Sequence, residues 1–396
     1  LDASGRLVVP GLIDMHVHLR EPGYEYKETI ATGCDAAAAG GFTAVVSMPN
    51  TEPVNDNASV TELVMQRARA HGGTIVHPAG AISAGQRGET LAEIGDMKAV
   101  GAVAFTDDGK PVMHAGLMRH AMEYATSLDV PIISHCEDLA LKGRGQMNEG
   151  PNSTRFGLRP IPAQAEEIMV ARDIALAELT GARLHIAHVS TEAALRHIRA
   201  AKKRRLKVTC ETAPHYLWLT DDLVGGYDTN SKVNPPLRAA ADVEALRKAL
   251  RDGTIDAIAT DHAPHSMVEK EVEYELASPG MIGLETSLGL VLKLVHEGVI
   301  TLRRAITLMS HGPARALGLP GGTLAAGADA NVTVIDPDLA WTVDPTPFKS
   351  ISRNTPFSMV ACTMLTPIRY RDAAGDVSGA GTRALNNLTV RECVHC

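Results

Sequence analysis

Eight short apolar runs rich in β-branched residues recur along the chain, and this recurrence limits the fold more than any other feature. Amphipathic segments of helical length follow several runs, at residues 116–128, 163–179, 191–203 and 241–250. Strands that alternate with helices in this way are typical of βαβ units and a parallel sheet. The eight runs lie at residues 12–19, 42–49, 74–82, 102–108, 131–137, 183–190, 207–214 and 256–262.

The number of these units favours a closed barrel. A (β/α)8 barrel of the TIM type takes about 250 residues and tolerates insertions. A doubly wound open sheet is the alternative, and the lack of a G-x-G-x-x-G motif after the first run weakens it. We therefore predict an α/β protein whose (β/α)8 barrel spans residues 11–320.

A small β module should accompany the barrel. After a helix-like segment at residues 301–319, residues 321–338 combine a Gly/Ala-rich turn with an alternating strand, and residues 340–344 suggest another strand. The opening stretch LDASGRLVVP has the composition to add strands to the same module. We predict a β-sandwich module built from residues 1–10 and 321–396, with an atypical tail from about residue 358.

Charge and composition exclude some classes of partner. A formal net charge of −8 gives no electrostatic footprint for nucleic acid. No apolar run approaches the roughly 18–20 residues of a membrane helix, and the first residues lack the pattern of a signal peptide. The six cysteines are scattered, and the terminal CVHC has no second pair, so we interpret it as a tail. Such cysteine usage favours reduced thiols and a cytoplasmic protein.

The first apolar run, in GLIDMHVHLREPG, carries His16, His18 and Arg20 at every second position. On a β-strand these three side chains would share one face, which neighbours such as Leu12 and Val17 mark as buried. Buried polar groups need partners, because an unpaired one costs roughly 2–7 kcal/mol. From this stretch alone, satisfied core histidines and metal ligands are both open.

Metal-ligand residue types also follow other predicted strands. Barrel enzymes keep their chemistry at the carboxyl ends of the strands, so these side chains should meet at one rim. Imidazole and carboxylate groups suit Zn²⁺, and their number exceeds what one tetrahedral ion uses. We predict two zinc ions and metal-assisted hydrolysis. The residues are His16, His18, Asp107, Asp108, His135, His188, Asp261, His262 and His265.

Seven motifs together resemble the class I dihydroorotase family of the amidohydrolase superfamily. The resemblance runs from about residue 1 to residue 357, with the motifs in family order. It implies a zinc-dependent enzyme of pyrimidine biosynthesis that reversibly cyclises N-carbamoyl-L-aspartate to (S)-dihydroorotate. The motifs are HVHLREPG (16–23), MPNT (48–51), FTDDG (105–109), SHCED (134–138), HIAHVST (185–191), NPPLR (234–238) and ATDHAPH (259–265).

The resemblance implies a role for each matching residue. One zinc ion would be bound by His16, His18 and Asp261, the other by His135 and His188, and Asp108 would bridge the pair; Asp107 would be structural. Asp261 would also act as the catalytic acid/base. Arg20, Asn50 and His265 would hold the substrate carboxylate. The implied substrate contacts in full are His18, Arg20, Asn50, Asn234, His265, Pro279 and Gly280.

Two alternatives remain open. The first is another cyclic amidase, namely dihydropyrimidinase, hydantoinase or allantoinase. Those enzymes typically bridge their metals with a carboxylated lysine, whereas the FTDDG motif of this chain supplies Asp108. A structural partner of aspartate carbamoyltransferase without activity would have lost metal ligands, and all six are present here. We expect a small-molecule substrate and neither nucleic acid nor a membrane as partner. A homodimer and an association with aspartate carbamoyltransferase stay open.

Both ends of the chain depart from the family pattern. Relatives usually carry further N-terminal strands of the β module, and the chain from about Ser358 onward does not follow the family's closing strands, with residues 363–386 resembling foreign sequence. We therefore expect an incomplete module with an unpaired sheet edge, and lower solubility than that of full-length relatives.

Overall fold

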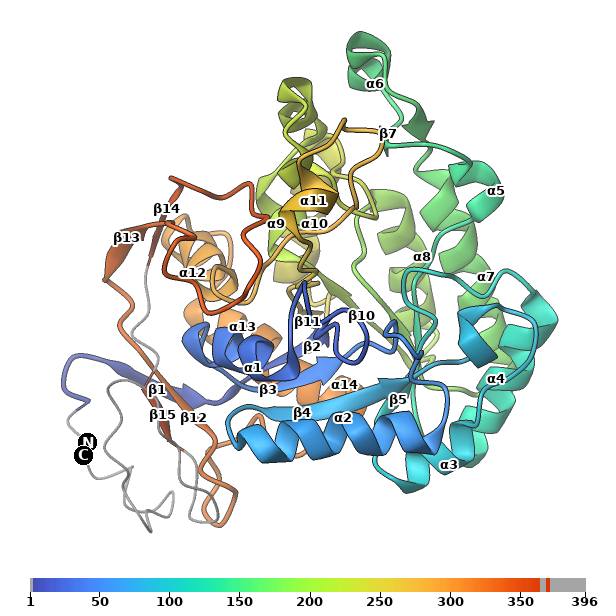
Figure 1. Cartoon of the computed structure of the whole chain (residues 1–396), viewed down its shortest axis with the longest axis horizontal. Coiled ribbons are helices and arrows are strands. Elements are labelled where there is room, and N and C mark those ends of the chain that lie inside the picture. Colours follow the sequence, from blue (N-terminus) through green and yellow to red (C-terminus); the bar gives the residue numbers. More distant parts are fainter. Residues whose placement is uncertain (1–2, 364–367, 371–396) are drawn as a thin grey trace.

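The computed structural model describes residues 3–363 and 368–370, and eight parallel strands form a barrel wall within them (Figure 1). Their order is β11-β10-β9-β6-β5-β4-β3-β2, and Val17 pairs in parallel with His262 across the seam between first and last strand. The predicted (β/α)8 barrel is confirmed. The strands are β2 (Leu12–Val17), β3 (Phe42–Ser47), β4 (Ile75–Gly80), β5 (Ala104–Phe105), β6 (Ile132–Ser134), β9 (Leu184–Ile186), β10 (Val208–Thr212) and β11 (Ala257–Ile258).

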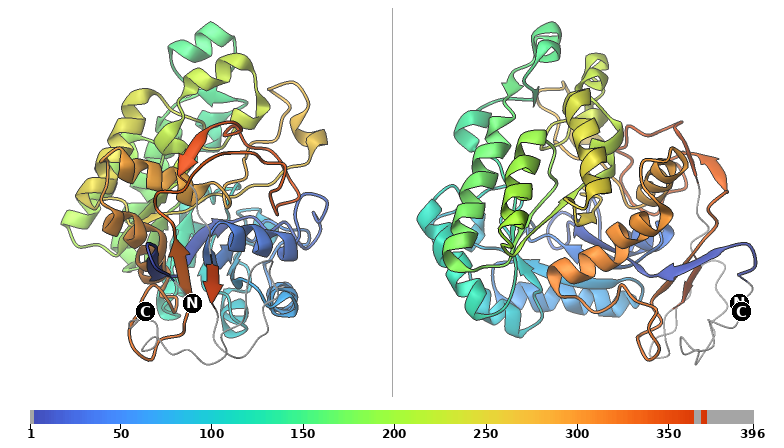
Figure 2. Two further views of the ribbon diagram at one scale, coloured as in Figure 1. Left: turned by 90° about the vertical axis from the view of Figure 1, so that its left-hand side faces the viewer. Right: turned by 180° about the vertical axis from the view of Figure 1, so that it is seen from behind.

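Helices connect the strands and surround the wall (Figure 2). The four helices expected from sequence are α4, α7, α8 and α10, each within two residues of its predicted ends. The main helices are α1 (Ile30–Ala39), α2 (Ala58–His71), α3 (Ile94–Ala99), α4 (Ala115–Ser127), α7 (Gln164–Thr180), α8 (Glu192–Lys203), α10 (Ala240–Asp252) and α12 (Ser287–His296).

Helix α8 illustrates why these segments are helical. Its buried residues include Leu195 and Ile198, which with neighbouring alanines form one apolar stripe facing the wall. The Thr191 side chain caps the first turn by accepting a hydrogen bond from Ala194 N. Lys202 and Lys203 occupy the last turn, where positive charge complements the helix dipole.

Short helices and strands lie within the loops that follow the barrel strands. The longest such insertion, between β6 and α7, projects at the top of Figure 1 around α6. These loops follow the carboxyl ends of the strands, so they rise around the rim that carries chemistry in barrels. The short elements are η1 (Ala84–Gln86), α5 (Leu139–Lys142), β7 (Met147–Asn148), α6 (Pro151–Phe156), β8 (Pro160–Ile161), α9 (Pro214–Trp218), η2 (Asp221–Gly226), η3 (Thr229–Ser231) and α11 (Met267–Lys270).

The apolar core has two layers. One large cluster fills the space between strands and helices, and a second lies inside the barrel. The inner cluster contains several small side chains, such as Ala79, Ala104 and Ala257, which leave space for larger polar groups on neighbouring strands. Helix α13 (Leu302–Ile306), a π-helical turn at Thr307–His311 and helix α14 (Gly312–Leu317) follow in series, and Leu317 of α14 joins the inner cluster.

A small β module is built from both parts of the chain that were expected to form it. Strand β1 (Leu7–Pro10) pairs antiparallel with β12 (Val332–Ile335), and β12 pairs with β15 (Ile368–Tyr370). A separate ribbon joins β13 (Ala340–Thr342) to β14 (Ala361–Thr363).

One side chain fastens this module to the barrel. Thr333 Oγ1 donates to Gly41 O at 2.8 Å and accepts from Leu12 N at 3.3 Å. Among the described residues, β1 and β15 pair with β12 alone, and the expected effect on solubility stays a prediction. The CVHC tail (393–396) and most of the atypical stretch 363–386 lie outside the described residues. In the part of the chain that the structure covers, no helix has both the length and the apolar character needed to cross a membrane.

Candidate metal centre and active site

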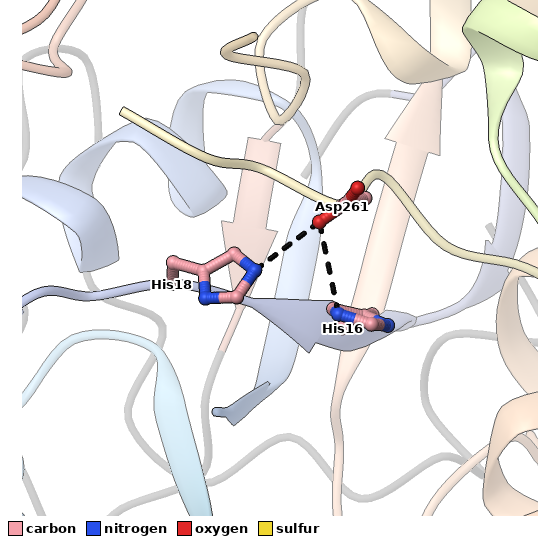
Figure 3. A group of neighbouring side chains, drawn as sticks. All are labelled: His16, His18 and Asp261. Carbon is pink, nitrogen blue, oxygen red and sulfur yellow. Dashed lines mark hydrogen bonds and ion pairs between the residues drawn. The ribbon is translucent and has the colours of Figure 1, made fainter. Parts of the chain in front are cut away.

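His16 in strand β2 and His18 just after it face Asp261, which follows the last barrel strand, β11. His18 Nε2 lies 3.2 Å from Asp261 Oδ1, and His16 Nε2 lies 3.7 Å from the same oxygen (Figure 3). All three side chains are buried, and their ligand atoms form a group that could hold one metal ion. His16, Asp108 and His188 form a second such group.

Asp108 lies at the centre of the four histidines. Its Oδ1 is 3.3 Å from His16 Nε2, 3.4 Å from His135 Nδ1 and 3.5 Å from His188 Nε2. Its Oδ2 is 3.5 Å from His18 Nε2. These residues come from the carboxyl ends of four strands, β2, β5, β6 and β9, and the barrel brings all of them together at one rim.

The donor set fits metal ions. His16 Nε2 and Asp108 Oδ1 are buried and have no hydrogen-bond partner among the described residues. Buried polar atoms are nearly always satisfied, so two such atoms facing each other indicate a missing shared partner. Imidazole nitrogens and carboxylate oxygens are ligands of divalent transition metals. The protein can therefore bind metal through these histidines and aspartates.

The cluster shifts the pKa values of its members. Burial works against ionisation of Asp108, but His16, His135 and His188 hold its pKa well below the usual value. Burial likewise opposes the charge on His135, yet Asp108 and Glu137 raise its pKa to about 9. Two buried carboxylates thus demand positive charge nearby, which either protons or metal ions can supply.

Backbone conformation aims three of these side chains. Among the non-glycine residues with positive φ are Arg20 (63°), His188 (32°) and Asp261 (49°). Such conformations cost of order 1–3 kcal/mol for non-glycine residues and cluster at functional sites. Strand β2 ends at Val17, so the prediction that Arg20 continues the strand is wrong; the left-handed turn at Arg20 redirects its side chain.

Asp107, the neighbour of Asp108, bonds to the loop after strand β4 and not to the metal cluster. Asp107 Oδ1 accepts hydrogen bonds from Ile82 N at 2.8 Å and Ser83 N at 3.1 Å, and its other oxygen bonds to the Ser83 hydroxyl. Burial raises the pKa of Asp107 to about 6, against the lowering effect of these bonds. This placement agrees with the structural role expected for Asp107.

Polar residues implied as substrate contacts line the same rim. Arg20 Nε donates to Pro264 O at 3.1 Å, and its Nη2 lies 3.4 Å from His265 Nε2. His265 Nε2 is also 2.9 Å from Pro279 O. These contacts hold the guanidinium, the imidazole and the 279–280 backbone as one cationic edge.

Two amides complete this rim. The Asn50 side-chain oxygen lies 2.8 Å from His18 Nδ1. On the far side, Asn234 Nδ2 lies 3.4 Å from His135 Nε2 and donates to Glu137 Oε2 at 3.1 Å. Each amide is therefore held next to a histidine of the metal cluster.

Gly280 occupies a position that only glycine fits. Its φ is +139°, and a Cβ there would lie 2.8 Å from the Cβ of Ala263 and 3.0 Å from His265 Nε2. The backbone at Gly280 can thus approach the loop that carries Asp261 more closely than any other residue would allow.

Sequence reasoning missed three polar residues that support the site. Glu211 lies 2.8 Å from His16 Nδ1, and a charged residue within an apolar run was the signal for it. Glu137 contacts His135 and Asn234 and stood within the quoted SHCED motif. Asn354 binds Ala263 O, Gly280 O and His265 N, and no local pattern marked it.

The chain resembles known proteins in sequence and in structure. A family model described as dihydro-orotase-like matches residues 5–194. A protein of Syntrophotalea carbinolica named dihydroorotase is 60% identical over 357 residues, which cover 90% of this chain and 84% of that protein. A dihydroorotase of Pelotomaculum thermopropionicum is 61% identical over 358 residues, with the same coverage of 90% and 84%.

A solved structure shares the fold at lower identity. The L-hydantoinase (dihydropyrimidinase) from Arthrobacter aurescens has a TM-score of 0.83 and 26% identity, and the match covers 96% of this chain and 88% of that one.

Proposed function

This chain belongs to the dihydroorotase family, and from that premise we propose that it is a zinc-dependent enzyme that interconverts N-carbamoyl-L-aspartate and (S)-dihydroorotate in pyrimidine biosynthesis. The observation that carries the proposal is the position of Asp108, whose two oxygens lie 3.3–3.5 Å from four histidine nitrogens. Because each oxygen of this carboxylate faces histidine nitrogens, each could bind a different metal ion, and the carboxylate could then bridge the two ions.

We assign the ligands as follows. His16, His18 and Asp261 would hold one Zn²⁺, His135 and His188 would hold the second, and Asp108 would contribute a ligand to both. When bound, zinc supplies an acidified water and polarises the carbonyl that this water attacks. The support for this assignment is the burial of all six side chains together with the unpaired atoms at His16 and Asp108.

The protein's own groups then handle protons and charge. Asp261 accepts a proton from the attacking water and passes it to the leaving ring nitrogen; in ring closure it works in reverse. The pKa of Asp261 lies below the usual value despite its burial, because His18 and His16 stabilise its anion. Asp261 is therefore ionised and ready to accept that proton near neutral pH.

The cationic edge formed by Arg20, His265 and the 279–280 backbone recognises the substrate. A planar guanidinium suits a carboxylate, so Arg20, with Asn50 and His265, holds the substrate carboxylate. Asn234 and the Pro279–Gly280 backbone contact the pyrimidine ring, and His18 borders the same space. The contacts between Arg20, His265 and Pro279 support this grouping.

A substrate comparison tests the proposal. Purified protein loaded with zinc should turn over dihydroorotate, while hydantoin and allantoin should react at least about 100-fold more slowly, since wrong-substrate contacts leave polar groups unpaired. A chelator should abolish the activity and zinc should restore it. Preference for hydantoin or allantoin would replace the proposed substrate with that of another cyclic amidase. Turnover that survives complete metal removal would refute the metal assignment.

Further proposals concern setting and assembly. We propose a cytoplasmic enzyme; Cys136 and Cys210 are buried thiols outside any disulfide, as suits that compartment. We also propose the division into a barrel over residues 11–320 and a module of residues 1–10 and 321–396. A homodimer and a complex with aspartate carbamoyltransferase are tested by light scattering of the protein alone and mixed with that transferase.

A further inference from the structure

A column of polar side chains runs through the barrel beneath the metal cluster. His16 Nδ1 lies 2.8 Å from Glu211 Oε1, and Glu211 Oε2 lies 3.3 Å from His185 Nε2. His185 Nδ1 in turn lies 2.8 Å from Thr209 Oγ1. These four residues come from strands β2, β9 and β10, and we call them the interior column.

The middle of this column is sealed from water. His16 and His185 are fully buried, and Glu211 is 1% exposed. His185 Nε2 and Glu211 Oε2 have no hydrogen-bond partner among the described residues, and they lie 3.3 Å from each other. A buried carboxylate in this position needs both imidazoles, because an unpaired buried charge is costly.

The geometry agrees with that arrangement. One carboxylate oxygen of Glu211 lies 2.8 Å from His16 Nδ1 and the other lies 3.3 Å from His185 Nε2, so Glu211 can accept from both rings.

The tautomers then follow in one direction. A histidine that binds metal through Nε2 must carry its proton on Nδ1, and His16 Nδ1–H donates to Glu211 Oε1. His185 donates to Glu211 through Nε2–H, which in the neutral ring makes Nδ1 an acceptor for the Thr209 hydroxyl. A single set of hydrogen-bond donors and acceptors thus satisfies the whole column. In this set the lone pair of His16 Nε2 stays available to bind a metal ion.

The lower end of the column reaches the surface. Thr209 borders a pocket of about 450 Å³ that Leu184 and Lys207 also line. This pocket lies at the strand starts, opposite the rim that carries the metal cluster. The column therefore spans the barrel from this pocket to a metal ligand.

We propose that His185 is a positioning residue for the metal: through Glu211 it fixes the tautomer and orientation of His16, and Thr209 fixes the tautomer of His185. This inference rests on the proposed role of His16 as a ligand. Partners of this kind typically change metal affinity by 10–100-fold when removed, without touching substrate.

Zinc affinity of the full chain, measured by competition with a chromophoric chelator, tests the proposal. His185→Leu should weaken zinc binding about 10–100-fold, because it leaves Glu211 Oε2 unpaired. His185→Gln, whose amide can still donate to Glu211, should recover most of that loss. Thr209→Val should give a smaller loss in the same direction. His77→Leu is the matched control: His77 is a histidine of strand β4 whose Nε2 has no hydrogen-bond partner within the described part of the chain, and its loss should leave zinc affinity unchanged.

Thermal unfolding of the metal-free variants separates positioning from general stability. If His185→Leu lowers the melting temperature of the metal-free protein but keeps wild-type zinc affinity, the positioning role is wrong and His185 only supports the core. An equal loss of affinity in His185→Gln and His185→Leu would also overturn it. Failure of the wild-type protein to bind zinc at all would instead refute the proposed function on which this inference rests.

Discussion

His135 Nδ1 lies 2.8 Å from His188 Nε2, and both nitrogens face Asp108 Oδ1 at 3.4 and 3.5 Å. Two imidazole nitrogens this close cannot both carry a proton. Either one shared proton or a metal ion must occupy the space that they face. Although burial lowers the pKa of His135, Asp108 and Glu137 raise it to about 9. In the metal-free protein a proton therefore occupies this space near neutral pH.

Zinc binding should therefore release protons and strengthen with pH. His135 has a pKa raised above its ordinary value, so in the metal-free state it is protonated near neutral pH and must lose that proton to become a ligand. Apparent zinc affinity should rise from about pH 6 to about pH 9 and then level off. Calorimetry in buffers of different ionisation enthalpy measures the released protons; zinc binding with no proton release near neutral pH would contradict the assignment.

The same shift sets a stability window for the metal-free protein. A raised histidine pKa adds stability that is fully present below the ordinary value of 6.5 and is lost as pH rises through about 9. Melting temperatures of metal-free wild type should thus fall between about pH 7 and pH 10. The matched variant His135→Gln should show a flatter profile, and identical slopes in the two proteins would rule out this origin.

Arg20→Met should weaken dihydroorotate binding while leaving zinc bound. The guanidinium is not a ligand, and its charge-assisted contact to a carboxylate is worth on the order of 1.5–3 kcal/mol. Steady-state kinetics and metal analysis measure the two effects. Arg20→Lys serves as the control that keeps the charge and loses the planar fork. Wild-type kcat/KM in Arg20→Met would remove Arg20 from the substrate site.

Asp261→Asn should abolish both directions of the reaction, since it removes the proton carrier as well as an anionic ligand. Loss of a general acid/base costs about 10²–10⁴-fold in rate. In the wild type, hydrolysis should need a deprotonated group and ring closure a protonated one. Forward and reverse rates that both rise with pH through one apparent pKa would argue against a single proton carrier.

Asp108 should bridge the ions without chemical modification, unlike a carboxylated lysine, which forms only with CO₂. Reconstitution with Zn²⁺ in CO₂-depleted buffer should restore full activity, and Asp108→Ala should lose the bridged pair. Lys110 is the lysine near this strand end that could be carboxylated. It is exposed and bonds to Asp107 only through its backbone nitrogen. Activity that returns only with bicarbonate, or a carboxylated lysine in the mass spectrum, would favour the hydantoinase-like alternative.

Asn354→Ala should raise KM more than it lowers kcat. Asn354 Nδ2 donates to Ala263 O at 3.0 Å and Gly280 O at 3.1 Å, and its oxygen accepts from His265 N at 3.1 Å. Loss of buried partners costs about 1–3 kcal/mol, which should appear as looser substrate binding with zinc content unchanged. Asn354→Asp keeps the acceptor for His265 N but sets a carboxylate oxygen against the carbonyl oxygens of Ala263 and Gly280, so its defect should be at least as large as that of Asn354→Ala; a wild-type KM in both variants would contradict this role.

Periodicity and spacing were enough to place the eight strands and the histidines and aspartates that follow them, whereas the metal-ligand roles came from the family resemblance. They failed where the backbone leaves the strand. Arg20 was expected one strand position after His18, but its positive φ ends that alternation. Contacts between distant segments were also beyond local pattern. Glu211 lies 195 positions from His16 and Asn354 lies 89 from His265, and only the folded barrel brings them together.

The barrel seam has a consequence for the order of synthesis. His18 and Asp261, which belong to one candidate metal group, stand 243 positions apart, just after the first and the last barrel strand. A ribosome must therefore have released nearly the whole barrel before that group exists. An ion held by this group cannot template the early strands as they emerge; it can only stabilise a barrel that has already closed. Nascent chains cut short before strand β11 should accordingly hold zinc only through the second group, His16, Asp108 and His188.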